Sequence, residues 1–328
     1  MNLTYKLEIN YDPDATISAK SLEFFNQLAS NKPEALLVIK LFIYLILKRE
    51  NKYQLALYLW GAAGSGKSVF ENLLLSLVGS KNSSSFSLNE LNNLHSLYTL
   101  KDSILSVFPD VSKFKGDPSK LKAIVSGDLI GARQLYKDKI SFNPKTLVLI
   151  TSNMLWEPND PTNGLQRRFI YLNVEKSSST ADRDLLNIKN NQYSGKLYDN
   201  LPGIVNWALS TTPEELKFFN QDTVEINNIL CPGLNAEVNP LILWIENSLE
   251  IKEGASAPIG NKKHNPNEFL YPHYYKFCKD HDFSPLSIQE FSNALVQQLT
   301  LFYKDVDFRK KRTKINTQIP NIQLVSSK

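Results

Sequence analysis

The fold is decided by the stretch Gly61-Ala62-Ala63-Gly64-Ser65-Gly66-Lys67-Ser68. It fits the pattern G-x-x-x-x-G-K-[ST] at every fixed position. Glycines let the backbone curl so that successive N–H groups point at one anion, and a helix that follows adds its positive N-terminal end. The stretch therefore predicts a loop that holds the phosphates of a nucleoside triphosphate. Lys67 would reach the β- and γ-phosphates, and the hydroxyl of Ser68 would ligate Mg²⁺.

The residues on either side of this loop have the pattern that such a loop requires. Residues 55–60 form a short apolar run typical of a buried strand, and residues 69–78 repeat apolar side chains at helical spacing. Three further apolar runs of strand length cover residues 103–108, 146–151 and 169–174. Strands that alternate with helices predict a three-layer α/β core.

Two polar residues follow predicted strands and are candidates for the chemistry of a nucleotide. Asp110 comes after the run 103–108, where an acid would hold Mg²⁺; the alternative is a Pro-Asp turn that ends the strand. Asn153 comes after the run 146–151. Its amide would orient the attacking water or sense the γ-phosphate, and the alternative is a residue that begins a loop.

Arg167 and Arg168 precede the last predicted strand. An arginine at this point could reach the nucleotide of a neighbouring subunit and stabilise charge on the transferred phosphoryl group. Adjacent side chains leave the chain in different directions, so the sequence does not choose between the two. The alternative is an ordinary surface arginine.

Residues 135–142 alternate apolar and basic side chains around a tight turn. This pattern predicts a hairpin that carries Lys137 and Lys139. In a ring of subunits such hairpins could touch the backbone of single-stranded DNA, and the alternative is a solvated charged face.

Composition sets wider limits. The chain has 328 residues, 42% of them hydrophobic, which as a prior suggests about two domains and excludes a disordered protein. Two cysteines exclude a disulfide scaffold and favour a reducing compartment. The net charge is only +4, but residues 101–145 carry nine Lys and Arg against five Asp, and residues 301–328 carry seven against two. The positive charge is therefore concentrated in two regions.

Outside the core, the patterns predict four segments. They are a helical N-terminal segment (residues 1–50), the α/β core (51–175), a helical appendage and linker (176–235) and a C-terminal module (236–328). Pro33 separates two helices in the first segment. In the appendage, Ser177–Thr180 marks a junction and Leu201-Pro202-Gly203 a helix break. The C-terminal module has helical patterns over 240–250, 269–281 and 287–299, followed by a basic, strand-like tail.

The longest apolar run, residues 35–47, has thirteen residues and contains Lys40. A membrane-spanning helix needs about twenty. We therefore expect a buried helix here and no membrane partner, and the N-terminus lacks the pattern of a signal peptide.

Taken together, these features resemble the superfamily 3 helicases, within the phage and plasmid primase–helicase group that has poxvirus relatives. The resemblance rests on the phosphate loop and on Asp110, Ser126-Gly127-Asp128, Arg133, Tyr136-Lys137, Phe142-x-Pro144-Lys145, Thr151-Ser152-Asn153 and Arg167-Arg168. Residues 198–209 resemble the segment that follows the ATPase core in that group. Residues 270–299 resemble its C-terminal winged-helix module, with residues 308–313 where a wing would lie.

The resemblance implies an AAA+-type P-loop ATPase core with a winged-helix module, and a homo-oligomer, usually a hexameric ring, that moves along single-stranded DNA. ATP and Mg²⁺ would be its cofactors. Residues 61–68 would hold the nucleotide, Ser68 and Asp110 the metal, Asn153 would be the sensor and Arg167 or Arg168 the finger. Lys137 and Lys139, with the basic tail residues Arg309, Lys310, Lys311 and Arg312, would contact DNA.

Two departures from the group affect this expectation. The group usually has a pair of acids at the second motif, whereas here Pro109 precedes a single Asp110. The residue that polarises the attacking water is therefore not identified. Only about fifty residues precede the core, too few for a primase module, so we expect no primase activity and a separate primase or initiator as partner.

The leading interpretation is an ATP-dependent DNA helicase or translocase that replicates a phage, plasmid, virus or organelle genome. It would work in the cytoplasm of the cell that carries the element, or in an organelle stroma. The alternative is a DNA-binding initiator or loader that ATP switches, with weak or no unwinding. A small-molecule kinase, which the loop alone allows, fits the basic C-terminal module less well.

Overall fold

The computed structural model describes residues 7, 9–111, 117–155, 164–175, 184–190, 192–232, 234, 240–281, 283, 285–303, 305–313 and 316–325. The chain divides into two compact units between Pro232 and Gly233, three residues before the boundary drawn from the sequence. The expected junction Ser177–Thr180 lies outside the described residues.

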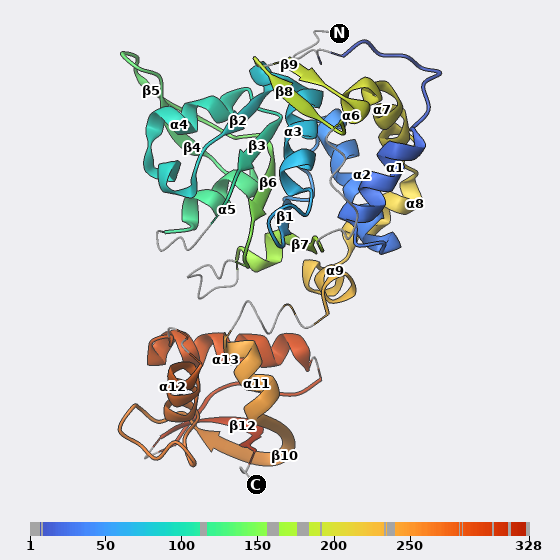
Figure 1. The fold of residues 1–328 in the computed structure, drawn as a ribbon. Coiled ribbons are helices and arrows are strands. Elements are labelled where there is room, and N and C mark those ends of the chain that lie inside the picture. The colour runs from blue at the N-terminus through green and yellow to red at the C-terminus, as the bar shows by residue number, and fades with distance from the viewer. Residues whose placement is uncertain are drawn as a thin grey trace. The chain divides into compact units, whose positions relative to one another are not determined.

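A parallel five-stranded sheet forms the centre of the described part of the first unit (Figure 1). Across the sheet its strands are β2 (Ser83–Ser85), β3 (Leu105–Phe108), β6 (Leu147–Ser152), β1 (Ala56–Trp60) and β7 (Phe169–Asn173). Four of these were predicted from apolar runs, and all four are buried along nearly their whole length. The sequence thus predicted a mixed α/β fold correctly.

The edge strand β2 was not predicted, because its sequence is Ser-Ser-Ser. Its pairing with β3 is supported by a row of three buried hydroxyl groups, from β2, from β3 and from the residue before β6. The hydroxyls of Ser84 and Ser106 lie 2.8 Å apart, and that of Ser106 lies 2.7 Å from the hydroxyl of Thr146, just before β6. Buried hydroxyl groups need such partners, so this strand depends on contacts that are distant in the sequence.

The helices of the first unit are α1 (Ala19–Leu28), α2 (Pro33–Lys48), α3 (Lys67–Val78), α4 (Leu94–Tyr98), α5 (Ser119–Ser126), α6 (Lys196–Asp199), α7 (Leu201–Leu209), α8 (Pro213–Leu216) and α9 (Thr223–Leu230). Short 3₁₀ turns lie at Ser80–Asn82, Leu88–Asn92, Thr99–Lys101, Gln166–Arg168 and Lys217–Asn220. Pro33 occupies the first turn of α2, as expected.

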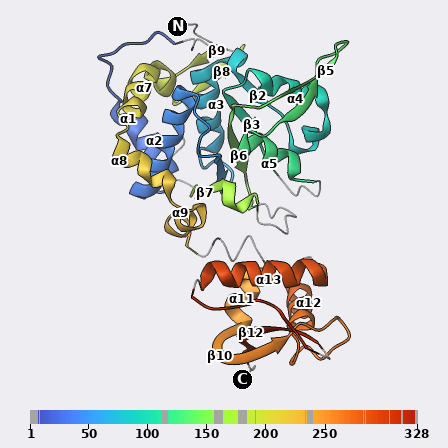
Figure 2. The ribbon, with the colours of Figure 1, turned by 180° about the vertical axis from the view of Figure 1, so that it is seen from behind.

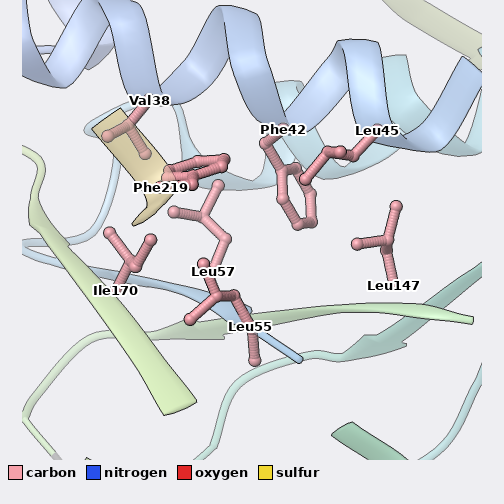
Figure 3. A pocket seen from close by; sticks show the side chains of 9 residues that line it. Val38, Phe42, Leu45, Leu55, Leu57, Leu147, Ile170 and Phe219 are labelled. Atoms are coloured by element: carbon pink, nitrogen blue, oxygen red, sulfur yellow. The ribbon is translucent and has the colours of Figure 1, made fainter. Parts of the chain in front are cut away.

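Helices α2 and α3 cover the same face of the sheet. Leu57 of β1 lies beside Ile170 of β7, and both line a small apolar gap under Phe42 of α2 (Figure 3). Two residues further along β1, Leu59 pairs with Thr151 of β6. The hydroxyl of Thr151 donates a hydrogen bond to Glu71 of α3. Side chains two residues apart in a strand share a face. The gap lies at the amino ends of β1 and β6 and has only hydrophobic lining, so we interpret it as a packing defect.

The edge strand β7 is covered by a buried amide from α9. Asn227 accepts a hydrogen bond from the backbone N–H of Tyr171 at 3.0 Å and donates one to the carbonyl of Phe169 at 2.8 Å. An unpaired strand edge exposes such groups to unwanted pairing. Asn227 therefore closes the sheet on the side of β7.

Two details after the core differ from the sequence prediction. The helix break lies at Asn200, and Pro202 falls in the first turn of α7, where a missing N–H is tolerated. Gly203 is needed inside α7 because a Cβ there would lie 2.1 Å from the carbonyl oxygen of Thr16. The prediction of a purely helical appendage was wrong, since β8 (Asn187–Lys189) and β9 (Gln192–Ser194) form a short antiparallel hairpin.

The described part of the second unit has helices α11 (Pro240–Ser248), α12 (Leu270–Asp280) and α13 (Ile288–Phe302) and strands β10 (Leu249–Pro258), β11 (Lys311–Arg312) and β12 (Thr317–Leu324). The three helices match the predicted helical patterns, whereas β10 was missed. The antiparallel sheet has the order β10-β12-β11, and the helices lie on one side of it (Figures 1 and 2). An aromatic cluster of Trp244, Tyr274 and Phe291 forms the centre of the core.

Among the helices that the structure describes, none combines the length and the apolar character that crossing a membrane requires.

Candidate functional site

The loop of residues 61–68 joins the carboxyl end of β1 to the first turn of α3, as predicted. Its backbone needs glycine at two points. Gly61 has φ +150°, and a Cβ there would lie 2.1 Å from the carbonyl oxygen of Val174. Gly66 has φ +101° and precedes α3. Other residues rarely adopt such φ angles, so the glycines of the motif have a structural reason in this chain.

Lys67 is buried and its ammonium group is held by the loop itself. It donates hydrogen bonds to the carbonyl oxygens of Gly61 at 2.7 Å and Ala62 at 2.9 Å, and to the hydroxyl of Ser65 at 3.2 Å. Burial lowers the pKa of Lys67, and the negative charge of Asp110 partly opposes this shift. The loop thus surrounds a cation with oxygen atoms, and phosphate oxygens could take their place.

Three of the predicted elements meet at the carboxyl edge of the sheet. The N–H of Gly61 donates to the carbonyl of Ser152 at 3.2 Å, and the N–H of Val111 donates to the carbonyl of Thr151 at 2.9 Å. Because β6 lies between β1 and β3, Asn153 follows the strand that stands between the loop and Asp110. The structure therefore brings the loop, Asp110 and Asn153 to one edge.

Asp110 and Asn153 both have exposed side chains. Asp110 has φ +46° in the turn after β3, a left-handed conformation that aspartate tolerates better than most residues. Its negative charge acts on both Lys67 and Glu71 and raises the pKa of each. Ser68 is exposed in the first turn of α3.

Glu71 belongs to this edge but was missed from the sequence. It lies one turn after Lys67 in α3, and its Oε2 accepts a hydrogen bond from the hydroxyl of Thr151 at 3.1 Å. Burial raises the pKa of Glu71 and the charge of Asp110 raises it further, while the bond from Thr151 opposes the shift. The four-residue spacing from Lys67, which puts both on one helix face, was the signal that could have identified it.

The two arginines before β7 differ in their surroundings. The guanidinium of Arg168 donates to the hydroxyl of Ser126 and to the carbonyl of Gly164, both at 2.6 Å. Arg167 is exposed. Arg168 thus ties α5 to the turn before β7, and Arg167 presents its charge to solvent.

The predicted hairpin is formed by β4 (Ile130–Arg133) and β5 (Lys139–Phe142), which pair in an antiparallel register. It extends from the first unit in both views (Figures 1 and 2). Lys137 and Lys139 are exposed, and Tyr136 at the turn is 93% exposed with φ +60°. Arg133 donates to the carbonyl of Lys137 at 2.9 Å, which braces the turn.

The basic residues of the C-terminal tail are not equivalent. Arg309 pairs with Asp307 through two bonds of 2.9 and 3.0 Å. The ammonium of Lys310 donates to the hydroxyl of Ser292 in α13 at 2.9 Å, and burial lowers its pKa. Lys311 and Arg312 form β11 and are exposed.

No group of three or more His, Cys, Asp or Glu side chains in the described residues could hold a metal ion. A protein-only metal cage is therefore absent from that part of the chain. Mg²⁺ needs no such cage, because it takes one or two protein oxygens and completes its shell with water and phosphate oxygens. The hydroxyl of Ser68 and the carboxylate of Asp110 are oxygen donors of this kind at the same edge.

Comparisons with known families match each unit separately. Residues 59–168 match a family of unknown function (DUF5906), and residues 239–325 match a family described as poxvirus D5 protein-like. The second match agrees with the resemblance to a replication group that has poxvirus relatives. Each match covers only part of the chain.

Solved structures resemble the chain over nearly its whole length. One, described as "The A form apo structure of NrS-1 C terminal region-CTR", is 13% identical with a TM-score of 0.52, over 95% of this chain and 78% of that one. Another, "The apo structure of NrS-1 C terminal region (305-718)", is 12% identical with a TM-score of 0.52, over 96% and 78%. At this identity the likeness concerns the fold alone.

Proposed function

We propose that this chain is an ATP-dependent DNA helicase or translocase that acts in the replication of a phage, plasmid, virus or organelle genome. The observation that carries the proposal is the meeting of the loop 61–68, Asp110 and Asn153 at the carboxyl edge of one parallel sheet. The poxvirus D5-like match of residues 239–325 supports a role in replication.

In this proposal the first unit is an AAA+-type P-loop NTPase core. When bound, Mg²⁺ would supply positive charge that neutralises the negative charge developing on the phosphates. Ser68 and Asp110 would hold it. Lys67 would exchange the carbonyl oxygens of Gly61 and Ala62 for phosphate oxygens, and because its ammonium is already desolvated, its attraction to phosphate would be strong.

Two further residues of the first unit, Asn153 and Arg167, would act on the γ-phosphate. Asn153, at the end of the strand between the loop and Asp110, would orient the attacking water through its amide. Arg167 is the better candidate for a finger that reaches the nucleotide of a neighbouring subunit in a hexameric ring, since it is exposed whereas Arg168 is bonded within the chain.

DNA would be held by two regions. The first is the hairpin β4–β5, whose exposed Lys137 and Lys139 suit contact with the phosphates of a single strand. The second is the C-terminal unit, which would act as a winged-helix module. Its order of helix, strand, two helices and two strands supports this, and Lys311 and Arg312 of β11 would border the wing. A separate primase or initiator would complete the replication machinery, and the working place would be a reducing cytoplasm or organelle stroma.

One observation favours the second candidate, an initiator or loader that ATP switches. Asp110 lies between Pro109 and the buried Val111, so the chain carries no second acid at that motif. Such a protein would bind ATP and change its affinity for DNA with little turnover.

The experiment that tests the proposal measures ATP hydrolysis with and without single-stranded DNA, alongside strand displacement on a forked duplex. We expect DNA to stimulate hydrolysis and Lys67→Ala to abolish both hydrolysis and unwinding. Lys81→Ala, which removes an exposed lysine just after α3, is the matched control and should behave as wild type. ATP-dependent DNA binding without turnover would instead support the loader, and no response to ATP would contradict both.

A further inference from the structure

Hydrolysis of ATP needs a group that polarises the attacking water and takes its proton, and the residues around Asp110 do not supply one. The chain neighbours of Asp110 are proline and a buried valine, neither of which can accept a proton. Asp110 itself would be occupied with Mg²⁺ in the proposed site. A second carboxylate must therefore come from another element.

Glu71 is a carboxylate at this edge that comes from α3. It is half-buried, so water can reach it, and its charge interacts with that of Asp110. One of its oxygens, Oε2, is fixed by the hydroxyl of Thr151 in β6. Among the described residues this is the one hydrogen bond of the Glu71 side chain, so Oε1 is left to accept from a water molecule.

The position of Glu71 relative to the other site residues fits this role. It follows Lys67 by one helical turn on the same face of α3. Thr151, which holds it, belongs to β6, the strand between the loop and Asp110, and Asn153 directly follows that strand. Glu71 is thus linked to three elements that carry the proposed nucleotide site.

We propose that Glu71 is the carboxylate that polarises the attacking water, and that Thr151 is the residue that positions it. This rests on the proposed function of ATP hydrolysis. In the step, the oxygen of water forms a bond to the γ-phosphorus while the bond from that phosphorus to the bridging oxygen breaks. ADP leaves with the electron pair of that bond, and the proton of the water passes to Glu71.

The environment of Glu71 favours proton transfer. A general base works best when its pKa is raised toward the working pH. Burial and the neighbouring Asp110 both raise the pKa of Glu71 above its ordinary value. The hydrogen bond from Thr151 opposes this shift and so favours the charged form, which is the form that accepts a proton.

The test compares Glu71→Gln, Glu71→Ala and Glu71→Asp with wild type in steady-state ATP hydrolysis. The glutamine variant keeps the shape of the side chain and can still accept the hydrogen bond from Thr151, but it carries no charge. The alanine variant is a second way to remove the carboxylate, and alanine is the residue most compatible with a helix. We expect kcat to fall about 100-fold or more in both, as removal of a general base does. Aspartate should restore part of the rate. Thr151→Val should lower kcat by a smaller factor.

Nucleotide binding and thermal stability, measured on the same variants, distinguish a catalytic role of Glu71 from a purely structural one. Binding of a non-hydrolysable ATP analogue with Mg²⁺ and the melting temperature should stay close to wild type. Glu225→Gln, the same change at an exposed position in α9, should leave kcat unchanged.

The outcomes separate this inference from the proposed function. If wild type hydrolyses ATP and loses activity with Lys67→Ala, but a folded Glu71→Gln or Glu71→Ala keeps the wild-type kcat, the role of Glu71 is wrong and the function stands. An aspartate variant no faster than alanine would also overturn it. Absence of hydrolysis by wild type would overturn the function and this inference together.

Discussion

The carboxyl edge of the first-unit sheet and the basic tail of the second unit both hold positive charge, but in opposite ways. Lys67 is buried and fixed by three oxygen acceptors within the chain. Lys311 and Arg312 are exposed on a two-residue strand. A buried, fixed charge recognises the geometry of one ligand, whereas exposed charges attract any polyanion and are screened by salt. The first region should therefore respond to small structural changes and the second to total charge.

The largest expected effect concerns Arg167, an exposed cation in the first unit, and it limits the comparison, since exposure alone would not make this charge behave like those of the tail. We expect Arg167→Ala to lower ATP hydrolysis about 1,000-fold, because a finger supplied by a neighbouring subunit contributes about that much. Mixing Arg167→Ala with Lys67→Ala subunits should restore part of the activity, measured as hydrolysis against mixing ratio.

Arg168→Ala is the matched control for that experiment. It removes two bonds of 2.6 Å to Ser126 and Gly164. It should therefore lower the free energy of unfolding by about 2 kcal/mol, whereas Arg167→Ala should not. Failure of every mixture to recover hydrolysis would exclude an arginine shared between subunits.

The next largest effect is expected from glycine substitutions in the loop 61–68, and it tests whether the loop depends on its backbone geometry. Gly61→Ala puts a Cβ against the carbonyl oxygen of Val174, so it should lower the free energy of unfolding by about 3 kcal/mol in chemical denaturation. Gly64→Ala is the comparison, since no atom lies within 4 Å of its Cβ and only its φ of +78° opposes a side chain. Its effect should be about 1 kcal/mol. Equal losses would show that steric contact with Val174 is unimportant.

A smaller effect is expected in the tail, where charge rather than position should matter. The double variant Lys311→Ala with Arg312→Ala should weaken single-stranded DNA binding several-fold. It should also reduce the slope of log affinity against log salt by about 1.4, at about 0.7 per lost contact. Fluorescence titration at several salt concentrations measures both.

Lys310→Ala is the control for the tail, because its ammonium is bonded to Ser292. Lys310→Ala should change the slope of log affinity against log salt less than the loss of either Lys311 or Arg312. A salt slope that none of these variants alters would mean that the tail does not touch DNA phosphates.

The smallest effect concerns the pair of Asp307 and Arg309. Its hydrogen bonds from Arg309 lower the pKa of Asp307 to about 2. The pair therefore persists at ordinary pH and is lost only as the pH falls through about 2. Asp307→Asn removes one negative charge and releases Arg309, and we expect DNA affinity to rise about twofold at low salt. Unchanged affinity would place Arg309 outside the DNA contact.

Sequence reasoning predicted the parts of the fold that have local patterns. The loop 61–68, the four apolar strands and α11, α12 and α13 are each recognisable from neighbouring residues. It missed β2, which depends on contacts from Ser106 to Ser84 and Thr146 across the sheet. It also missed the hairpin β8–β9, because strands of three residues are too short for an alternating pattern to be recognised.

The candidate site shows the same limit. Lys67 could be nominated from the motif of the loop, and Asp110 and Asn153 because each follows a predicted strand. Glu71 could not, because its relation to Thr151 and Asp110 depends on how α3 packs on the sheet. The difference between Arg167 and Arg168 likewise required the position of α5, which supplies Ser126 near the end of that helix.

Equilibrium binding of a non-hydrolysable ATP analogue with Mg²⁺, measured by calorimetry on wild type and Lys67→Ala, tests the central claim most directly. If the carboxyl edge of the sheet is a nucleotide site built around Lys67, wild type should bind one analogue per chain. Lys67→Ala should then lose about 100-fold in affinity, or about 2.8 kcal/mol. Equal binding by the two proteins, or no binding by wild type, would contradict the account.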